Sequence, residues 1–189
     1  MPTPSDDIIT PRLILRLMQR EVVDACLAGD LAGAGHALGA AIPDALLDHP
    51  SSLRFAQARL NEDPEYQPWS ARAIILPQPR TMVGHVRFHS RPDPEYLHPH
   101  ARHAVELGYQ VFPPYRRRGY ATEAVAAAMD WAQAEFGIDR FIVSVSPDNA
   151  PSLALIARFN FTRIGQHMDE IDGIEHIYLR AAARPGRAP

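Results

Sequence analysis

A strand, a double proline, a glycine-containing loop and a long helix follow one another in the middle of the chain, and this succession constrains the fold most. Residues 104–112 are mainly apolar and include β-branched valine, as expected of a strand. Pro113-Pro114 must end that strand because proline has no N–H to donate. After Gly119, apolar residues recur at helical spacing as far as Phe136. The sequence therefore predicts a strand that leads through a tight loop into a long amphipathic helix.

The other elements follow from hydrophobic periodicity and from the residues that interrupt it. Glycine occurs three times in residues 31–42, so we expect a loop or mobile cover there. The proline-rich segment 90–103 has no period and is expected to be irregular. Apolar residues at helical spacing predict shorter helices at residues 22–27, 53–60 and 153–159. Alternating or β-branched runs predict further strands at residues 12–17, 71–76, 82–88, 140–145, 162–168 and 175–179.

The order of these elements predicts the fold class. Strands interrupted by helices, with at least one strand-helix-strand crossover, indicate an α+β domain with a mixed sheet. A length of 189 residues and a hydrophobic content of 46% suit one compact domain. We expect this domain to span residues 1–183 and residues 184–189 to form a short tail.

Composition and charge narrow the range of partners. The formal net charge of -3 argues against nucleic acid and against an anionic membrane as partners. No apolar run approaches the roughly 18 residues that cross a bilayer, and the N-terminus lacks the basic and apolar regions of a signal peptide. The single Cys26 lies on an apolar helical stretch and is expected to be buried and inert. A cytoplasmic protein that acts on a small molecule is the resulting expectation.

The histidines of residues 85–103 raise the question of a metal site. Their spacing matches no zinc pattern and no cysteine accompanies them, so we predict no metal and expect them in solvated loops or a substrate pocket. They are His85, His89, His98, His100 and His103.

The loop before the long helix has the chemistry of a phosphate site. Free backbone N–H groups gather at the positive end of the helix dipole, and Gly119 permits close approach of a ligand. The run Arg116-Arg117-Arg118 adds positive charge, although such a run is also common on a solvated surface. The loop matches neither the nucleoside-triphosphatase nor the dinucleotide-binding glycine pattern.

At these residues the sequence resembles the GNAT N-acetyltransferase superfamily, most closely the branch that acetylates ribosomal proteins and other N-terminal amines. Arg116, Gly119 and Ala121 match the family's pyrophosphate-loop pattern of Gln or Arg, two residues, Gly, one residue, and Gly or Ala. The resemblance is strong over residues 104–165 and weaker elsewhere. The other segments that carry it are residues 10–16, 106–109, 120–124, 149–152 and 158–161.

The resemblance implies a mostly antiparallel sheet, flanked by helices and splayed between its fourth and fifth strands, with coenzyme A in the gap. Backbone groups of Gln110, Val111 and Phe112 would hold the pantetheine arm, and Asn149 and Ser152 would contact the cofactor from the other side. Any of the three arginines could bind the 3′-phosphate. The loop residues implied for the pyrophosphate are Arg116, Arg117, Arg118, Gly119, Tyr120, Ala121 and Thr122.

Two positions depart from the family pattern. Ile156 stands where many members place the tyrosine that protonates the leaving thiolate, so Ser152 is the remaining candidate acid. Ser152 could equally serve only to satisfy a backbone N–H in the first helical turn. Asn160 replaces the usual glycine at the helix end, a mild change because asparagine also accepts the left-handed conformation.

Glu106 is the candidate base, acting directly or through water, because it begins the strand beside the expected thioester. A plain surface carboxylate is the alternative reading.

The sequence thus predicts an acetyl-coenzyme A-dependent N-acetyltransferase that works by direct attack in a ternary complex. A catalytically weak acyl-coenzyme A sensor is the alternative, and an RNA-associated protein is disfavoured by the acidic charge. The acceptor amine, a peptide N-terminus or a small molecule, is left open, as is the homodimer common in the family. Residues 29–63 and 90–103 are expected to set acceptor specificity.

Overall fold

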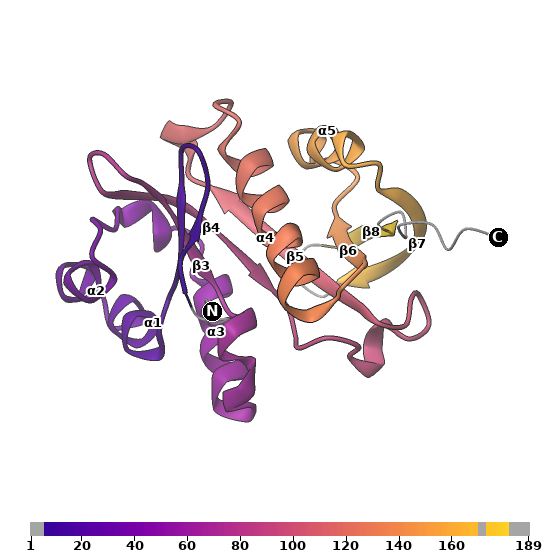
Figure 1. Cartoon of the computed structure of the whole chain (residues 1–189), viewed down its shortest axis with the longest axis horizontal. Coiled ribbons are helices and arrows are strands. Elements are labelled where there is room, and N and C mark those ends of the chain that lie inside the picture. The colour runs from indigo at the N-terminus through magenta and orange to yellow at the C-terminus, as the bar shows by residue number, and fades with distance from the viewer. Residues whose placement is uncertain (1–5, 170–172, 182–189) are drawn as a thin grey trace.

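A computed structural model describes residues 6–169 and 173–181, and within these ranges the chain forms one mixed sheet with helices on both faces (Figure 1). The strand order is β1-β2-β3-β4-β5-β6-β8-β7, with every pair antiparallel except β5 and β6. The predicted fold class is confirmed. The strands are β1 Ile8–Ile9, β2 Ile14–Leu17, β3 Arg72–Leu76, β4 Thr81–Phe88, β5 Ala104–Val111, β6 Arg140–Val145, β7 Thr162–Asp169 and β8 Gly173–Ala181.

The helices lie close to their predicted positions, apart from one addition. The segment 90–103 is irregular as expected, apart from a short 3-10 turn. Residues 184–189 lie outside the described part, so the predicted tail stays a prediction. The helices are α1 Arg20–Leu27, α2 Leu31–Leu38, α3 Ser51–Glu62, α4 Tyr120–Phe136 and α5 Ala150–Arg158.

Helix α2 is the addition, and it shows that the loop predicted for this stretch was wrong over Leu31–Leu38. The side chain of Asp30 caps the helix by accepting a hydrogen bond from the Gly33 amide at 2.8 Å. Gly39 ends it with a φ of 70°, which glycine adopts without strain. Leu38 is buried against the rest of the core. Capping and burial therefore outweigh the low helix propensity of the glycines.

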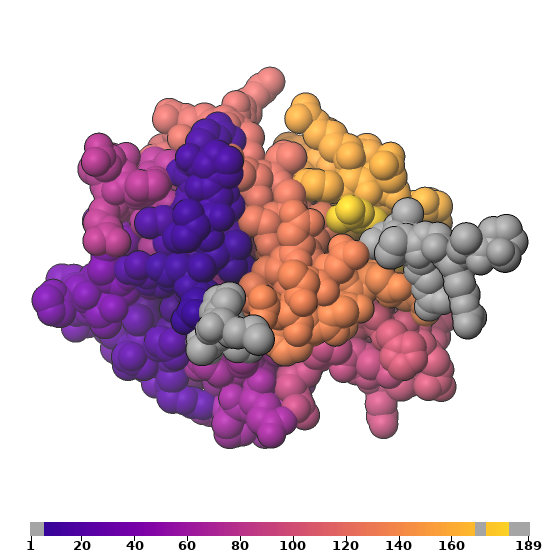
Figure 2. All heavy atoms as spheres, viewed as in Figure 1, coloured from indigo at the N-terminus to yellow at the C-terminus, as the bar shows by residue number. Residues whose placement is uncertain are grey.

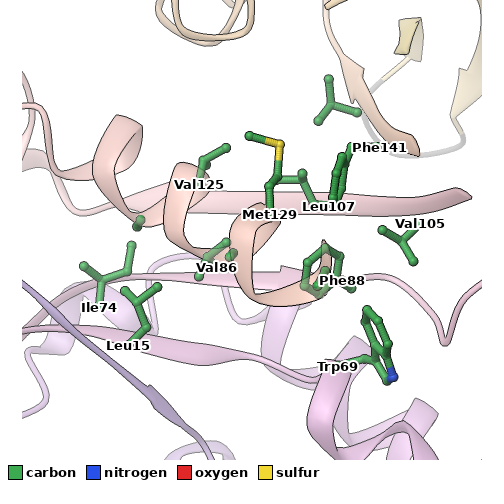
Figure 3. Packing of buried hydrophobic residues seen from close by; sticks show 14 of the residues in the cluster. Leu15, Trp69, Ile74, Val86, Phe88, Val105, Leu107, Val125, Met129 and Phe141 are labelled. Atoms are coloured by element: carbon green, nitrogen blue, oxygen red, sulfur yellow. The ribbon is translucent and has the colours of Figure 1, made fainter. Parts of the chain in front are cut away.

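Two apolar clusters hold the layers together. Along β3, Ile74 packs in the cluster beneath α4, whereas its neighbours Ala73 and Ile75 pack in the cluster beneath α1 and α2, as strand alternation requires. Figure 3 shows Val125 and Met129 of α4 among the buried side chains of the first cluster. Each such side chain contributes about 1.5–3 kcal/mol when buried. Helix α4 is thus fixed along its length.

The second cluster contains Cys26, which is buried as predicted. Burial raises the pKa of its thiol to about 11, so it stays protonated at neutral pH. Within the described ranges, no helix combines the length and the apolar character needed to span a membrane.

Candidate active site

The loop between β5 and α4 presents the N–H groups of a helix N-terminus. Gly119 precedes the helix with a φ of 79°, in the region that favours glycine, and no side chain of the described residues caps α4. An added Cβ at Gly119 would lie 3.2 Å from Nη2 of Arg12, so the loop is closely packed on that side. The amides of the first turn are therefore open to an anion.

The three arginines of this loop have different roles. Arg116 donates from Nε to the Val111 carbonyl at 2.9 Å, and Arg118 donates from Nη2 to the Pro114 carbonyl at 3.3 Å. Arg117 is exposed, has a φ of 60°, and makes no hydrogen bond or ion pair with any described residue. Two arginines thus brace the loop, and the guanidinium of Arg117 is left for a ligand.

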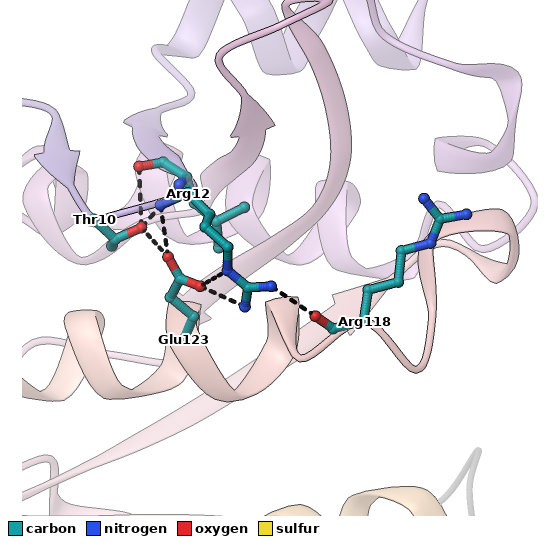
Figure 4. Close-up of polar contacts among 5 residues, drawn as sticks. Thr10, Arg12, Arg118 and Glu123 are labelled. Carbon is teal, nitrogen blue, oxygen red and sulfur yellow. Dashed lines mark hydrogen bonds and ion pairs between the residues drawn. The ribbon is translucent and has the colours of Figure 1, made fainter.

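A polar network ties this loop to the N-terminal strands (Figure 4). One Glu123 oxygen accepts from Thr10 Oγ1 at 2.6 Å and from the Arg12 backbone N–H at 2.9 Å. The other Glu123 oxygen accepts from Arg12 Nε at 2.6 Å, while Arg12 Nη1 donates to the Arg118 carbonyl at 3.0 Å. Figure 2 shows the indigo N-terminal strands lying directly against the orange helix α4.

The ionised state of Glu123 favours this network. Burial acts to raise the pKa of Glu123, but hydrogen bonds from Thr10 and Arg12 and the charge of Arg12 hold it below its usual value. Glu123 is therefore ionised at neutral pH and keeps the loop in place.

The sheet opens beside this loop, as the predicted splay requires. Strands β5 and β6 pair only from Ala104 opposite Arg140 to Glu106 opposite Ile142, and then diverge. The splay between the fourth and fifth predicted strands is confirmed. A cavity of about 310 Å³ fills the gap, lined by Leu107, Gly108, Tyr109, Val143, Ser144, Val145, Ser146, Asn149, Ser152 and Glu175.

Backbone direction decides which parts of β5 face this gap. The His89 N–H donates to Glu106 and the Phe112 N–H donates to Val83, so the even-numbered residues of β5 pair with β4. Alternation turns the backbone of Val111, with Leu107 and Tyr109, toward the cavity.

The predicted contacts of the pantetheine arm fall on both sides of β5. The Phe112 carbonyl accepts from Tyr115, which leaves neither backbone group of Phe112 free. Gln110 directs its side chain away from the gap, where Oε1 lies 3.1 Å from His85 Nε2. Of the three residues predicted to hold the arm, Val111 is the one whose backbone faces the β6 side, where its carbonyl accepts from Arg116.

The N-terminus of α5 forms the opposite wall. Asn149 caps this helix, its Oδ1 accepting from the Ser152 amide at 3.2 Å. Ser152 lines the cavity beside Tyr109. Burial raises the pKa of the Tyr109 phenol, whose hydroxyl is buried without a hydrogen-bond partner among the described residues. Ile156 is 2% exposed and belongs to the core, so it contributes nothing to the cavity.

The end of this helix also follows its prediction. Asn160 adopts a φ of 58°, the left-handed conformation expected of the residue that replaces glycine there.

Glu106 lies at the point where β5 and β6 part, and it is 7% exposed. Oε1 accepts from Ser144 Oγ at 2.7 Å, and Oε2 lies 3.4 Å from His89 Nδ1. Burial acts to raise its pKa, but hydrogen bonds from His89, Ser144 and Tyr96 and the charge of His89 outweigh it and lower the pKa to about 2. The carboxylate is ionised at neutral pH and touches the cavity through Ser144.

The histidines occupy separate surroundings. Both His98 and His103 lie near the carboxylate of Asp93, at 3.3 and 3.7 Å. Burial lowers the pKa of His85 to about 4, so it is neutral. In the described part of the chain, no group of three or more histidine, cysteine, aspartate or glutamate side chains could hold a metal ion.

The family model of the GNAT acetyltransferase domain matches residues 12–162, which include β5, α5 and the loop between β5 and α4. The chain belongs to the GNAT acetyltransferase family.

Curated GNAT relatives match over part of their length. The uncharacterized N-acetyltransferase YnaD of Bacillus subtilis is 25% identical over 124 residues, which cover 66% of this chain and 65% of YnaD. YoaA of the same organism is 26% identical over 86 residues, 46% of this chain and 45% of YoaA. The chain therefore spans less than two thirds of each of these relatives.

Solved GNAT structures share the fold over nearly the whole chain. The ribosomal-protein-S5-alanine acetyltransferase of Vibrio fischeri has a TM-score of 0.64 at 16% identity, covering 97% of this chain and 100% of that one. RimL, a ribosomal L7/L12 α-N-protein acetyltransferase in complex with coenzyme A, has a TM-score of 0.62 at 20% identity, covering 94% and 98%.

The residues of this GNAT site fit acetyl-coenzyme A. The uncapped N-terminus of α4 and the free guanidinium of Arg117 suit phosphates, and the edge of β5 beyond Glu106, which does not pair with β6, offers backbone groups to an extended chain with amides. When bound, acetyl-coenzyme A would supply the activated acetyl group.

Sequence reasoning missed the residues that support this site. Thr10 and Arg12 contact Glu123 across more than a hundred residues, and His89 contacts Glu106 from the neighbouring strand. The one sequence signal for these residues is the family resemblance, because it includes the segments that contain Thr10, Arg12 and Glu123.

Proposed function

We propose that this protein transfers the acetyl group of acetyl-coenzyme A to a primary amine by direct attack in a ternary complex. The observation that carries the proposal is the cavity between β5 and β6, which opens beside the uncapped N-terminus of α4. A cofactor held across this gap and loop places its thioester near Glu106 and Ser152. The only described cysteine, Cys26, is buried in the other cluster, so we propose no covalent enzyme intermediate.

The protonation of the acceptor favours an α-amine. A lysine amine with a pKa of about 10.4 costs ~4.6 kcal/mol to deprotonate at pH 7, whereas an α-amine near 7.7–8 costs only about 1 kcal/mol. A base with a pKa as low as that of Glu106 contributes little to the deprotonation of a lysine amine. We therefore place a peptide N-terminus or a small α-amine ahead of a lysine side chain. Two of the structural neighbours described above are N-terminal or ribosomal-protein acetyltransferases by name, which supports this choice.

Proton transfer completes the proposal. Glu106 accepts the amine proton through water, while Ser144 and His89 hold its carboxylate in place. As the C–N bond forms and the C–S bond breaks, Ser152 donates a proton toward the leaving thiolate. Asn149, Arg116, Arg117 and Arg118, with the loop from Gly119 to Thr122, hold the cofactor.

The alternative is a catalytically weak acyl-coenzyme A sensor. It is favoured by the burial of Ile156 and by the low pKa of Glu106, which weaken the expected acid and base.

A thiol-release assay with a panel of amines and peptide N-termini tests the proposal. We expect thiol release with at least one α-amine, and a Glu106→Gln variant that loses turnover more than coenzyme A affinity. Tight coenzyme A binding with no thiol released from any acceptor would favour the sensor. Unchanged turnover in Glu106→Gln would remove Glu106 from proton transfer.

A further inference from the structure

Basic side chains gather around Phe55 on the face of the sheet that α3 covers. The Cζ atoms of Arg87 and Arg59 lie 5.0 and 5.4 Å from the centre of the Phe55 ring. The His89 ring centre lies 5.4 Å from the same ring. We call Phe55, Arg59, Arg87 and His89 the Phe55 cluster. Arginine stacks on aromatic rings and also binds carboxylates through paired N–H donors, so the cluster has the chemistry to bind an anion.

Arg87 is the member of this cluster whose charge is not neutralised. It forms no ion pair or hydrogen bond with any described residue, and its Nε is buried without a partner. Arg59, in contrast, pairs with Glu62 at 3.1 Å on the surface. Burial lowers the pKa of the Arg87 guanidinium, which is the cost of holding a cation away from water.

The acidic groups near Arg87 are already engaged. Glu106 and Tyr66 act on Arg87 through space. The Tyr66 phenol is neutral, because burial raises its pKa, and it donates to the Phe88 carbonyl. Glu106 is held by Ser144 and His89. An additional carboxylate at Arg87 would therefore find a desolvated cation without a partner, where such a pair is strongest.

The position of Arg87 connects this cation to the cavity. On β4 it lies directly opposite Gly108, which lines the gap between β5 and β6. Adjacent strands lie about 4.8 Å apart, so the backbone from which the Arg87 side chain extends is one strand away from the cavity. An acceptor of one or two residues can span that distance.

We propose that the acceptor is an amine that also carries a carboxylate, and that Arg87 binds this carboxylate. The inference rests on the proposed acetyl transfer and names the class of its second substrate. Arg59 contacts the same phenyl ring from helix α3. The carboxylate belongs either to a free amino acid or to an acidic residue near a peptide N-terminus, since both present the same chemistry.

Matched acceptors that differ only in the carboxylate test the inference in the thiol-release assay. Glycine is compared with glycinamide, and peptides with aspartate at the second position are compared with their asparagine counterparts. We expect kcat/KM to be roughly tenfold to a hundredfold higher for the carboxylate member of at least one pair, as for a charge-assisted hydrogen bond. The pair that shows the preference identifies the source of the carboxylate.

Variants then assign the preference to Arg87. In Arg87→Gln we expect the ratio between the two acceptors to fall toward one while activity on the amide is retained. Arg87→Lys keeps the charge and retains part of the ratio. Arg54→Gln is the control, because it removes an exposed arginine from α3, the helix that carries Phe55. We expect it to leave the ratio unchanged.

The outcomes separate this inference from the proposed function. Equal kcat/KM within every wild-type pair, with thiol released, overturns the inference and leaves acetyl transfer standing. A preference that survives in Arg87→Gln also overturns the role of Arg87. No thiol release from any acceptor instead overturns the proposed function. If Arg87→Gln does not fold, the wild-type ratios and Arg87→Lys still decide.

Discussion

At the scale of single residues, the chemistry of this site depends on charges whose surroundings are unlike water. Glu106 is a buried anion in contact with Ser144 and His89, Arg87 is a partly buried cation with no hydrogen-bond or ion-pair partner among the described residues, and Arg117 is a cation exposed to solvent. Because these three charges have different surroundings, substituting each of them should affect a different property of the protein.

Glu106 should make stability depend on acid pH. Its folded pKa of about 2 lies below the unfolded value near 4.3, so the stabilisation is complete above that value and is lost as pH falls toward the folded pKa. The shift corresponds to roughly 3 kcal/mol of unfolding free energy. We expect Glu106→Gln to be less stable than wild type at pH 7, with the difference shrinking between pH 5 and pH 3. Thermal melts of both proteins across this pH range measure the difference in stability. A difference that does not change with pH would contradict the prediction.

Arg117 should contribute to coenzyme A affinity alone. Replacing it by alanine removes a free guanidinium from the phosphate loop without breaking a described contact. We expect the Kd for coenzyme A to rise about three- to tenfold at low salt, the usual worth of one such contact, and less at high salt. Calorimetric titration measures the Kd at both salt concentrations. Arg163→Ala, on the distant hairpin of β7, serves as control; equal effects of the two substitutions would argue against a specific role.

Residues in local motifs were predictable, and residues that act across the sheet were not. The uncapped helix N-terminus after Gly119 and the cap at Asn149 follow from neighbouring residues alone. The neighbours of Glu106 and Arg87 on adjacent strands depend on strand register, which no short pattern specifies.

At the scale of elements, the N-terminal strands act as a brace for the phosphate loop. Glu123 receives hydrogen bonds from Thr10 and Arg12, and Arg12 also reaches the Arg118 carbonyl. The short strand β1, which periodicity did not predict, brings these residues beside α4.

Breaking this brace should loosen the loop without unfolding the protein. In Glu123→Gln we expect the Kd for coenzyme A to rise severalfold and stability to fall by about 1–2 kcal/mol, since charged hydrogen bonds are replaced by weaker ones. Glu135→Gln, on an exposed turn of the same helix, provides the matched control. Binding titrations and urea melts separate the two effects, and an unchanged Kd would show that the loop holds its shape without Glu123.

Helix α2 shows where element prediction failed for a physical reason. Propensity disfavours a helix with internal glycines, but an aspartate cap at one end and a left-handed glycine at the other define it. The capping aspartate and the final glycine are visible in the sequence, but the burial of Leu38 against the core cannot be predicted from it.

At the scale of the whole molecule, the two walls of the cavity come from different halves of the sheet. One wall belongs to β5, which pairs with β4, and the other to α5, which follows β6. A ligand held by both walls binds the folded chain and not the unfolded one.

Coenzyme A should therefore raise the melting temperature. At a hundredfold excess over Kd, the gain is about 2.7 kcal/mol, or roughly 5–10 °C for a chain of this size. Differential scanning fluorimetry measures the shift, with pantetheine as the comparison that lacks the phosphates of the loop. An equal shift with both ligands would mean that the phosphate loop contributes nothing.

The parting of β5 and β6 also has a consequence for self-association. Unpaired strand edges are templates on which other polypeptides add strands, and they are a common origin of aggregation. Here the unpaired edge of β5 lies inside the sheet, between the loop before α4 and the start of α5. A second polypeptide would have to fit the side chains on both sides of its backbone into the gap between β5 and β6. An unbranched chain with amide groups requires only the width of a backbone. The fold thus keeps an open edge for a ligand and withholds it from other proteins.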